Sequence, residues 1–136
     1  MRVLLTGHQG YLGTVMAPIL AAAGHEVTGL DSGLFAASVL GSLDVPDAPT
    51  LAVDLRDVTV EQLQGFDAVV HMAALSNDPL GSLAPEITYD INHHASTRLA
   101  RIRGVQCRAR FAEAFHVAKL VLGVAPLDGA DAPESA

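Results

Sequence analysis

Short apolar runs alternate with amphipathic stretches along the first hundred residues. Residues 2–6 (RVLLT) form a nearly continuous apolar run that ends in a glycine, which is typical of a strand buried on both faces of a parallel sheet. From Tyr11 to Ala23 the apolar residues recur at helical spacing, although Pro18 removes one helix hydrogen bond. Residues 26–30 then predict a second strand that ends at Asp31.

The alternation continues downstream and predicts the fold class. We expect, in order, a long loop with one helical turn over 32–50, a third strand over 51–53, a brief helix over 58–64, a fourth strand over 66–72, a helix over 85–103, a fifth strand over 105–111 and a helix over 112–124. This succession predicts an α/β fold built of right-handed βαβ units, with helices on both faces of a parallel sheet. Together with the glycine-rich turn described below, it predicts a Rossmann-like doubly wound parallel sheet with strand order 3-2-1-4 that residues 105–111 could extend. The domain is expected to span residues 1–124, and residues 125–136 to form a disordered tail.

Composition and charge narrow the class of protein. The chain has 136 residues, half of them apolar, which suits one domain with a real core. Its net charge of −7 argues against a nucleic acid or an anionic membrane surface as partner. A single cysteine, Cys107, excludes an intramolecular disulfide, and no apolar run is long enough to cross a membrane. We therefore expect a soluble, cytoplasmic protein.

A glycine-rich turn directly follows the first predicted strand and opens the first predicted helix. Gly7 permits the tight turn, Gly10 allows the backbone to approach a pyrophosphate, and Gly13 allows close packing of helix on sheet. The start of the helix offers free N–H groups and partial positive charge to phosphates. We expect the turn to bind a dinucleotide through Gly7, Gly10, Tyr11, Leu12 and Gly13.

An acidic residue strengthens this hypothesis and indicates which dinucleotide binds. Asp31 ends the second predicted strand, 24 residues after Gly7, where a carboxylate can accept both ribose hydroxyls of an adenosine and would repel a 2′-phosphate. No arginine lies between Asp31 and Leu43, so NAD is favoured over NADP. The alternative is that the glycines form only a turn and that Asp31 is a solvated strand end.

As a set, these residues resemble a known family. The chain is similar to the extended short-chain dehydrogenase/reductases, and specifically to the NAD-dependent epimerase/dehydratases of nucleotide sugars. The similarity covers about residues 1–105 and rests on Thr-Gly-x-x-Gly-x-x-Gly from Thr6, Asp31, Asp54-Leu55, His71-Met72-Ala73-Ala74, Ser76-Asn77-Asp78-Pro79-Leu80-Gly81 and Asn92.

The resemblance implies further site residues. Asp54 and Leu55 would flank the adenine, with Asp54 near its amino group. Ala73, Ala74 and Ser76 would line the cofactor trough, and Asn92 would be a structural helix residue. A nucleotide sugar would be the substrate.

The catalytic pattern of this family is missing. Its acid/base is a tyrosine in Tyr-x-x-x-Lys on the helix after the fifth strand, since residues four apart share a helix face. Neither Tyr11 nor Tyr89 precedes a lysine by four, and the only lysine, Lys119, has Phe115 in that position. We therefore expect no catalytic residue here, in a truncated or rearranged copy that keeps the cofactor half. The alternative is a non-catalytic module that binds or senses NAD.

The remaining candidate residues give weaker evidence of a functional site. His93 and His94 are adjacent on a helix and therefore point about 100° apart, and no His-x-x-x-His pair accompanies them, so we expect no metal site. His71 is expected to be a core or trough-lining residue rather than a base. The arginines at 98, 101, 103, 108 and 110 form either a solvated face or a subunit or phosphate contact. If residues 105–111 do not dock beside the fourth strand, an apolar edge is exposed, which predicts a homodimer or aggregation.

Overall fold

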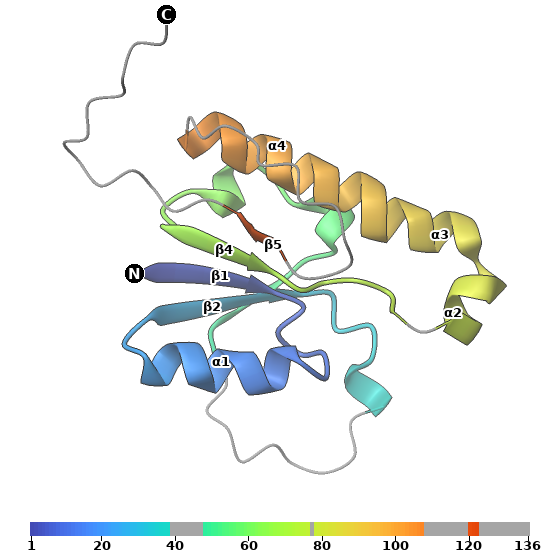
Figure 1. Ribbon diagram of the computed structural model, residues 1–136, viewed down its shortest axis with the longest axis horizontal. Helices are drawn as coiled ribbons and strands as arrows, with labels where there is room; N and C mark the ends of the chain where they lie inside the picture. The colour runs from blue at the N-terminus through green and yellow to red at the C-terminus, as the bar shows by residue number, and fades with distance from the viewer. Residues whose placement is uncertain (39–47, 77, 108–119, 123–136) are drawn as a thin grey trace, which may run out of the picture.

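A five-stranded sheet forms the centre of the computed structural model, which describes residues 1–38, 48–76, 78–107 and 120–122 (Figure 1). The order across the sheet is β3-β2-β1-β4-β5. The strands β3, β2, β1 and β4 run parallel to one another, and β5 runs antiparallel to β4. The strands are β1 (Arg2–Thr6), β2 (Glu26–Asp31), β3 (Thr50–Ala52), β4 (Ala68–His71) and β5 (Leu120–Leu122).

Helical segments connect the strands. α1 and the segments around α4 lie on opposite sides of the sheet, as in a doubly wound fold (Figure 1). The α-helices are α1 (Gly13–Ala22), α2 (Asp78–Leu83), α3 (Pro85–Tyr89) and α4 (Ser96–Cys107). The 3₁₀ turns are η1 (Ala36–Ser38), η2 (Leu55–Asp57) and η3 (Glu61–Leu63). A π-helical stretch, η4 (Asp90–Ala95), joins α3 to α4, and these three segments together are called the long helix.

The main core cluster lies on the face of the sheet that α4 covers. Leu4, Leu30 and Val69 contribute one residue each from β1, β2 and β4, and all three are at most 1% exposed. These strand residues pack with side chains from η2, η3 and the long helix: Leu55, Val58, Leu63, Ala95 and Leu99. Burial of central strands on both faces explains why the sequence of β1 is a continuous apolar run.

The predicted strand order 3-2-1-4 is confirmed, and so are the helix after β1 and the long helix after β4. The single helical turn in the 32–50 loop is observed as η1, and residues 39–47 lie outside the described part. The helix expected over 58–64 is only the short η3. Helix α2 has no counterpart among the predicted elements.

Two predictions near the end of the chain are wrong. Residues 105–107, expected to begin a strand, belong to α4, which continues through Gly104. A single helical glycine costs only about 1 kcal/mol, so it does not end a helix by itself. The fifth strand is instead Leu120–Leu122, within the helix expected over 112–124, because a short apolar run is compatible with either structure. The remaining residues of both segments, and the expected tail, lie outside the described residues.

No helix in the described residues is long and apolar enough to cross a membrane.

Candidate nucleotide-binding site

The turn after β1 brings three strands together at the carboxyl edge of the sheet. Gly7 has φ +71°, a conformation that favours glycine, and its N–H donates to the Leu30 carbonyl of β2 at 2.8 Å. A Cβ on Gly7 would lie 2.8 Å from the Ala73 backbone, which follows β4. Gly7 is therefore required both for the turn itself and for its close contact with the segment after β4.

The other two glycines pack the turn against the start of α1. A Cβ on Gly13 would overlap the Gly7 carbonyl and the His8 backbone. The Gly10 N–H donates to the Gly7 carbonyl at 3.0 Å, and the Gly10 carbonyl accepts from the Thr14 N–H at 3.0 Å. The turn is therefore compact, and because these positions are glycines, no side chain of theirs covers the backbone.

The first turn of α1 has the properties of an anion site. No side chain caps it, and it contains no acidic residue that would compensate the positive end of the helix dipole. Gly10, Tyr11 and Leu12 are all exposed. A phosphate group can therefore reach this backbone.

Asp31 lies beside the turn, as predicted. Its Oδ2 accepts from the Gln9 N–H at 3.1 Å, and its Oδ1 accepts from the Gly33 N–H at 2.9 Å. Each carboxylate oxygen has a second lone pair, so the group can still accept a hydrogen bond from a ligand hydroxyl. The side chain thus links the glycine turn to the loop after β2.

Asp54 and Leu55 follow β3 and have different surroundings. Asp54 accepts three hydrogen bonds from Arg56, through the backbone N–H (2.9 Å) and the guanidinium (3.0 and 2.8 Å). The side-chain hydrogen bond from Arg56 is the main cause that lowers the pKa of Asp54. The Leu55 side chain is buried in the core, so only its backbone is available to a ligand.

The segment after β4 is held against the glycine turn. The hydroxyl of Thr6 accepts from the N–H groups of Met72 (3.0 Å) and Ala73 (3.2 Å). Asn92, on the long helix, donates to the Leu75 carbonyl at 2.7 Å and accepts from its N–H at 2.8 Å. This pairing agrees with the structural role expected for Asn92.

The residues expected to line a trough differ in exposure. Ala73 is partly buried against the core, whereas Ala74 and Ser76 are exposed.

His71 is a buried core residue, as expected. Its Nδ1 lies 2.7 Å from the Thr6 hydroxyl, and its Nε2 lies 2.8 Å from the Ser96 hydroxyl. Because Thr6 already accepts two N–H groups, its proton points to Nδ1, so the imidazole proton is on Nε2 and is donated to Ser96. Burial lowers the pKa of His71 to about 4, which keeps the ring neutral at pH 7.

This proton arrangement argues against a nucleophilic role for Ser96. A serine nucleophile needs a histidine nitrogen that accepts its proton, whereas Nε2 of His71 donates to Ser96. The low pKa also makes His71 a weak base. The Thr6–His71–Ser96 group therefore joins β1, β4 and α4 as a structural connection.

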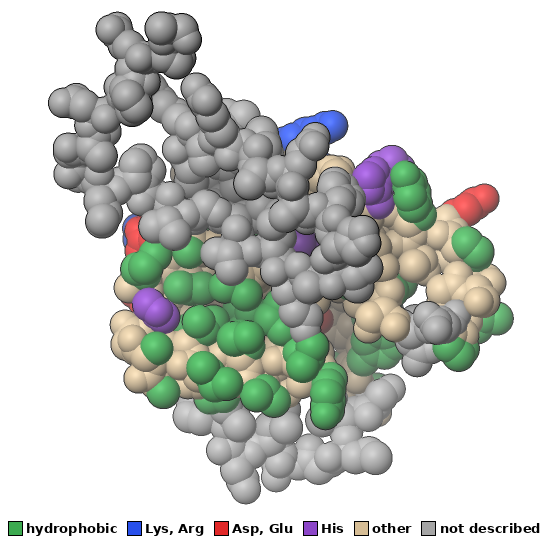
Figure 2. All heavy atoms as spheres, in the orientation of Figure 1, with side chains coloured by type: hydrophobic (Ala, Val, Ile, Leu, Met, Phe, Trp, Pro, Cys, Tyr) green, Lys and Arg blue, Asp and Glu red, His purple; other side chains and the backbone are tan. Residues whose placement is uncertain are grey.

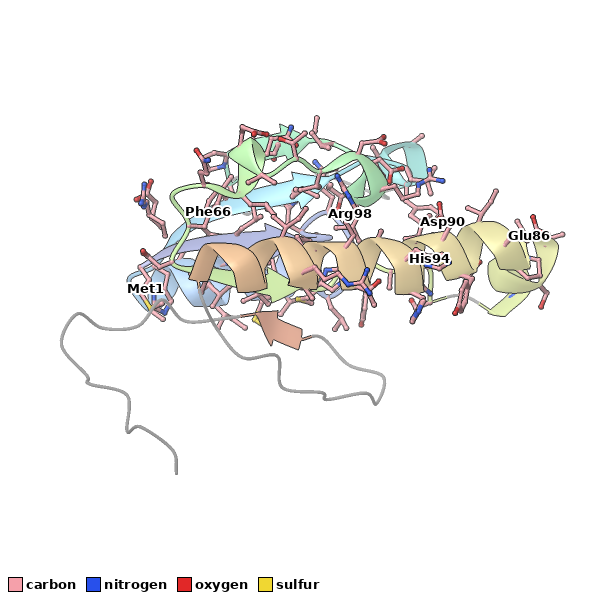
Figure 3. The ribbon with its side chains drawn as sticks, turned by 90° about the horizontal axis from the view of Figure 1, so that it is seen from above. Met1, Phe66, Glu86, Asp90, His94 and Arg98 are labelled. Atoms are coloured by element: carbon pink, nitrogen blue, oxygen red, sulfur yellow. The ribbon has the colours of Figure 1, made fainter. Side chains whose placement is uncertain are left out.

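The histidines of the long helix contact a tyrosine ring and each other. Tyr89 stacks on His93 with ring centroids 4.8 Å apart, and His94 meets both rings edge-on. Within the described residues, no group of three or more His, Cys, Asp or Glu could hold a metal ion. Figure 3 shows Glu86, Asp90, His94 and Arg98 following one another along this helix.

A separate depression of about 430 Å³ lies on the long helix, lined by Glu86, Ile87, Tyr89, Asp90 and His94. None of the expected cofactor residues lines it.

The structure brings most of the expected site residues to one edge of the sheet. The glycine turn, Asp31 and the segment from Ala73 are connected through hydrogen bonds or backbone contact. The sequence reasoning missed Thr6 as a clamp and His8 as a buried turn residue. The one available signal was their place in the motif, Thr6 as the last residue of the strand and His8 directly after Gly7.

The fit of a dinucleotide can be judged from these features. Two glycines leave no room for a Cβ, an uncapped helix start is exposed, and a carboxylate stands at the end of β2. Together with the strand order, these features define a Rossmann-type dinucleotide-binding fold.

Comparison with known proteins identifies the family. The chain belongs to the NAD dependent epimerase/dehydratase family, whose model matches residues 3–115. It is 42% identical over 79 residues to a UDP-glucose 4-epimerase of Corynebacterium glutamicum, a match that covers 56% of this chain and 23% of that protein.

Solved structures agree with this assignment. The UDP-glucose 4-epimerase of Thermus thermophilus in complex with NAD has a TM-score of 0.62 and 30% identity, over 78% of this chain and 35% of that one. The UDP-N-acetylglucosamine 4-epimerase of Methanobrevibacter ruminantium, in complex with UDP-N-acetylmuramic acid, has a TM-score of 0.61 and 27% identity, over 74% of this chain and 33% of that one. The chain spans about a quarter of the curated relatives' length and about a third of these structures.

Proposed function

We propose that this chain is the NAD-binding part of an epimerase/dehydratase-like protein that acts on nucleotide sugars. The observation that carries the proposal is the glycine turn, which is closed onto β2 and the segment after β4 and stands next to the Asp31 carboxylate. Similarity to epimerase structures in complex with NAD supports the same cofactor.

Each expected residue has a role in this proposal. The backbone of Gly7, Gly10, Tyr11, Leu12 and Gly13 holds the pyrophosphate at the start of α1. Asp31 accepts the ribose hydroxyls of the adenosine, with its charge held in place by the N–H groups of Gln9 and Gly33. The adenine contacts Asp54 and the Leu55 backbone, and Ala73, Ala74 and Ser76 line the cofactor trough.

The chemistry of the family needs a group that this chain lacks. Bound NAD would supply a hydride acceptor for a sugar carbon. The 136 residues contain no Tyr-x-x-x-Lys pair that could move the accompanying proton. We therefore propose an incomplete copy that binds the cofactor without turning over a sugar. Membership of the family favours an epimerase/dehydratase-like protein over the alternative, a non-catalytic module that binds or senses NAD.

Calorimetric titration of the chain with NAD⁺ and NADP⁺ tests the proposal. NAD⁺ should bind with one site per chain and NADP⁺ more weakly, because a 2′-phosphate would meet the Asp31 carboxylate. Asp31→Ala should weaken NAD⁺ binding by about tenfold, the loss of one charge-assisted hydrogen-bonding group. Asp57→Ala is the matched control, since Asp57 is an exposed carboxylate outside the site.

A folded chain that does not bind NAD⁺ would overturn the proposal, as would an Asp31→Ala variant with unchanged affinity. The incomplete-copy part has its own test. Incubation of the NAD⁺-loaded chain with UDP-glucose should leave the sugar nucleotide unchanged on chromatography, whereas its conversion to an epimer or a dehydrated product would show that another residue supplies the acid/base.

The proposal also includes location and assembly. The lone cysteine, Cys107, suits the reducing cytoplasm. The edge of β4 is paired with β5, so a homodimer would instead use the exposed apolar side chains of Val15 and Ile19 on α1. Cell fractionation tests the location, and sedimentation equilibrium of the purified chain tests the assembly. A monomer at all concentrations would contradict the homodimer.

A further inference from the structure

His8 is a buried side chain within an exposed turn. Its neighbours Gln9, Gly10 and Tyr11 are all exposed, whereas His8 is only 7% exposed. One buried side chain therefore holds the turn against the sheet, at the point where the backbone leaves β1 for α1.

The imidazole of His8 occupies a space that Gly29 leaves open. A Cβ on Gly29 would overlap the His8 ring. Gly29 of β2 is paired in register with Thr50 of β3, so the ring covers one cross-strand pair of the outer sheet. The His8 ring can therefore lie there only because Gly29 has no side chain.

A hydrogen bond fixes the orientation of this ring. The Nε2 atom lies 2.9 Å from the Thr50 hydroxyl, and that hydroxyl donates to the Ala48 carbonyl at 3.0 Å. Because the Thr50 proton is used in this way, Nε2 carries the imidazole proton and donates to Thr50. Nδ1 is buried and has no hydrogen-bond partner in the described residues, so one nitrogen alone sets the ring position.

We propose that His8 is a positioning residue for the cofactor, which holds the phosphate-binding turn in register with β2 and β3. The inference rests on the proposed function. Gln9, whose N–H donates to Asp31, and Gly10 follow His8 directly. Movement of His8 therefore shifts both the pyrophosphate backbone and the N–H that orients the Asp31 carboxylate, and small displacements of a binding group carry large losses.

Substitution of the two hydrogen-bonding partners separates positioning from packing. NAD⁺ affinity is measured by calorimetry on the full chain, with circular dichroism and thermal unfolding as measures of folding. His8→Leu fills the space without a donor and should weaken NAD⁺ binding by about tenfold, and Thr50→Val by a similar or smaller factor. His8→Gln, whose amide N–H can still reach Thr50, should restore most of the affinity. His94→Leu, at an exposed histidine, is the matched control and should have no effect.

A second pair of variants tests the anchor from the opposite side. Gly29→Ala lies in β2, and its methyl group displaces the His8 ring, so it should also weaken NAD⁺ binding by about tenfold. The single variant His8→Ala removes the ring and should weaken NAD⁺ binding by about tenfold. In the double variant Gly29→Ala/His8→Ala the two effects should not multiply: the loss should be about tenfold rather than a hundredfold. Gly81→Ala is the control, because a Cβ there makes only ordinary contacts, 3.8 Å from Thr88.

The outcomes are distinct. If His8→Leu and Gly29→Ala lower the unfolding temperature but leave the NAD⁺ affinity of the folded chain unchanged, His8 is a packing residue only and the inference is wrong. Multiplicative losses in the double variant, or failure of His8→Gln to restore affinity, would also overturn it. If the unsubstituted chain itself does not bind NAD⁺, the proposed function fails, and this inference fails with it.

Discussion

The two faces of the sheet differ in how completely they are covered. On the α4 side, residues from three strands, two 3₁₀ turns and the long helix form one core cluster, and Leu4, Leu63 and Val69 are fully buried. On the α1 side, Val3, Leu5 and Val27 are buried in the sheet, yet Val15 and Ile19 of the covering helix are more than half exposed. The α4 side therefore carries most of the apolar burial.

Helix α1 has the composition of a helix with two buried faces. It contains no charged residue, and its stripe of Leu12, Val15 and Ile19 is 48–56% exposed. Figure 2 shows apolar side chains gathered over this region. A helix that is apolar all round is usually covered on both sides, so the difference between the faces marks where the fold is stabilised and where surface remains open.

The largest expected effect is a cavity in the α4-side core. Leu63→Ala removes a fully buried side chain and should lower the free energy of unfolding by about 2–5 kcal/mol. Urea unfolding followed by circular dichroism measures this. A loss below about 1 kcal/mol would show that the α4-side cluster is not the main source of stability.

The α4 side should also show the stronger response to acid, through His71. Its pKa is about 4 in the folded chain against 6.5 in the unfolded chain, so between these values only the unfolded state takes up the proton. The contribution of His71 to stability should therefore be constant above pH 6.5, fall by roughly 3 kcal/mol as the pH drops to 4, and level off below that. Any further loss below pH 4 comes from carboxyls with a lowered pKa, such as Asp54. Urea unfolding at a series of pH values measures the fall. Titration of the His71 imidazole in the folded chain, followed by NMR, with a midpoint near 6.5 would contradict this prediction.

Thr6 tests the connection between the core and the cofactor edge. Thr6→Val keeps the shape but removes the acceptor for the Ala73 N–H, one of the two acceptors for the Met72 N–H and the donor to His71, which should cost about 1–3 kcal/mol. Thr28→Val makes the same change on β2 and should cost less. Equal losses in the two variants, measured by urea unfolding, would show that the Thr6 hydroxyl has no special role.

The smallest effect is expected on the α1 side. Ile19→Glu places a charge at a position that is 56% exposed and should change the free energy of unfolding by less than about 0.5 kcal/mol. The variant should also be more soluble than the parent chain. A loss comparable to that of Leu63→Ala would mean that the α1 stripe is buried in solution.

The site could be predicted where a local conformation carries the signal. Gly7, Gly10 and Gly13 follow a strand at fixed spacing, and Asp31 ends the next strand. The glycine turn and the acidic residue could therefore each be recognised from a short stretch of sequence. Leu55 shows the limit, because the expected adenine contact has its side chain in the core, which no motif reveals.

Hydrophobic periodicity by itself determined where the first four strands lie along the chain and that helices follow β1 and β4, because each signal lies within a few consecutive residues. Only the tertiary structure decided the pairs that are distant in sequence: His8 with Thr50, and His71 with Thr6 and Ser96. It also decided that residues 105–107 continue α4 and that Leu120–Leu122 pairs antiparallel with β4. A short apolar or alternating run is compatible with helix or strand, and the choice depends on which hydrogen-bonding partner the folded chain brings beside it.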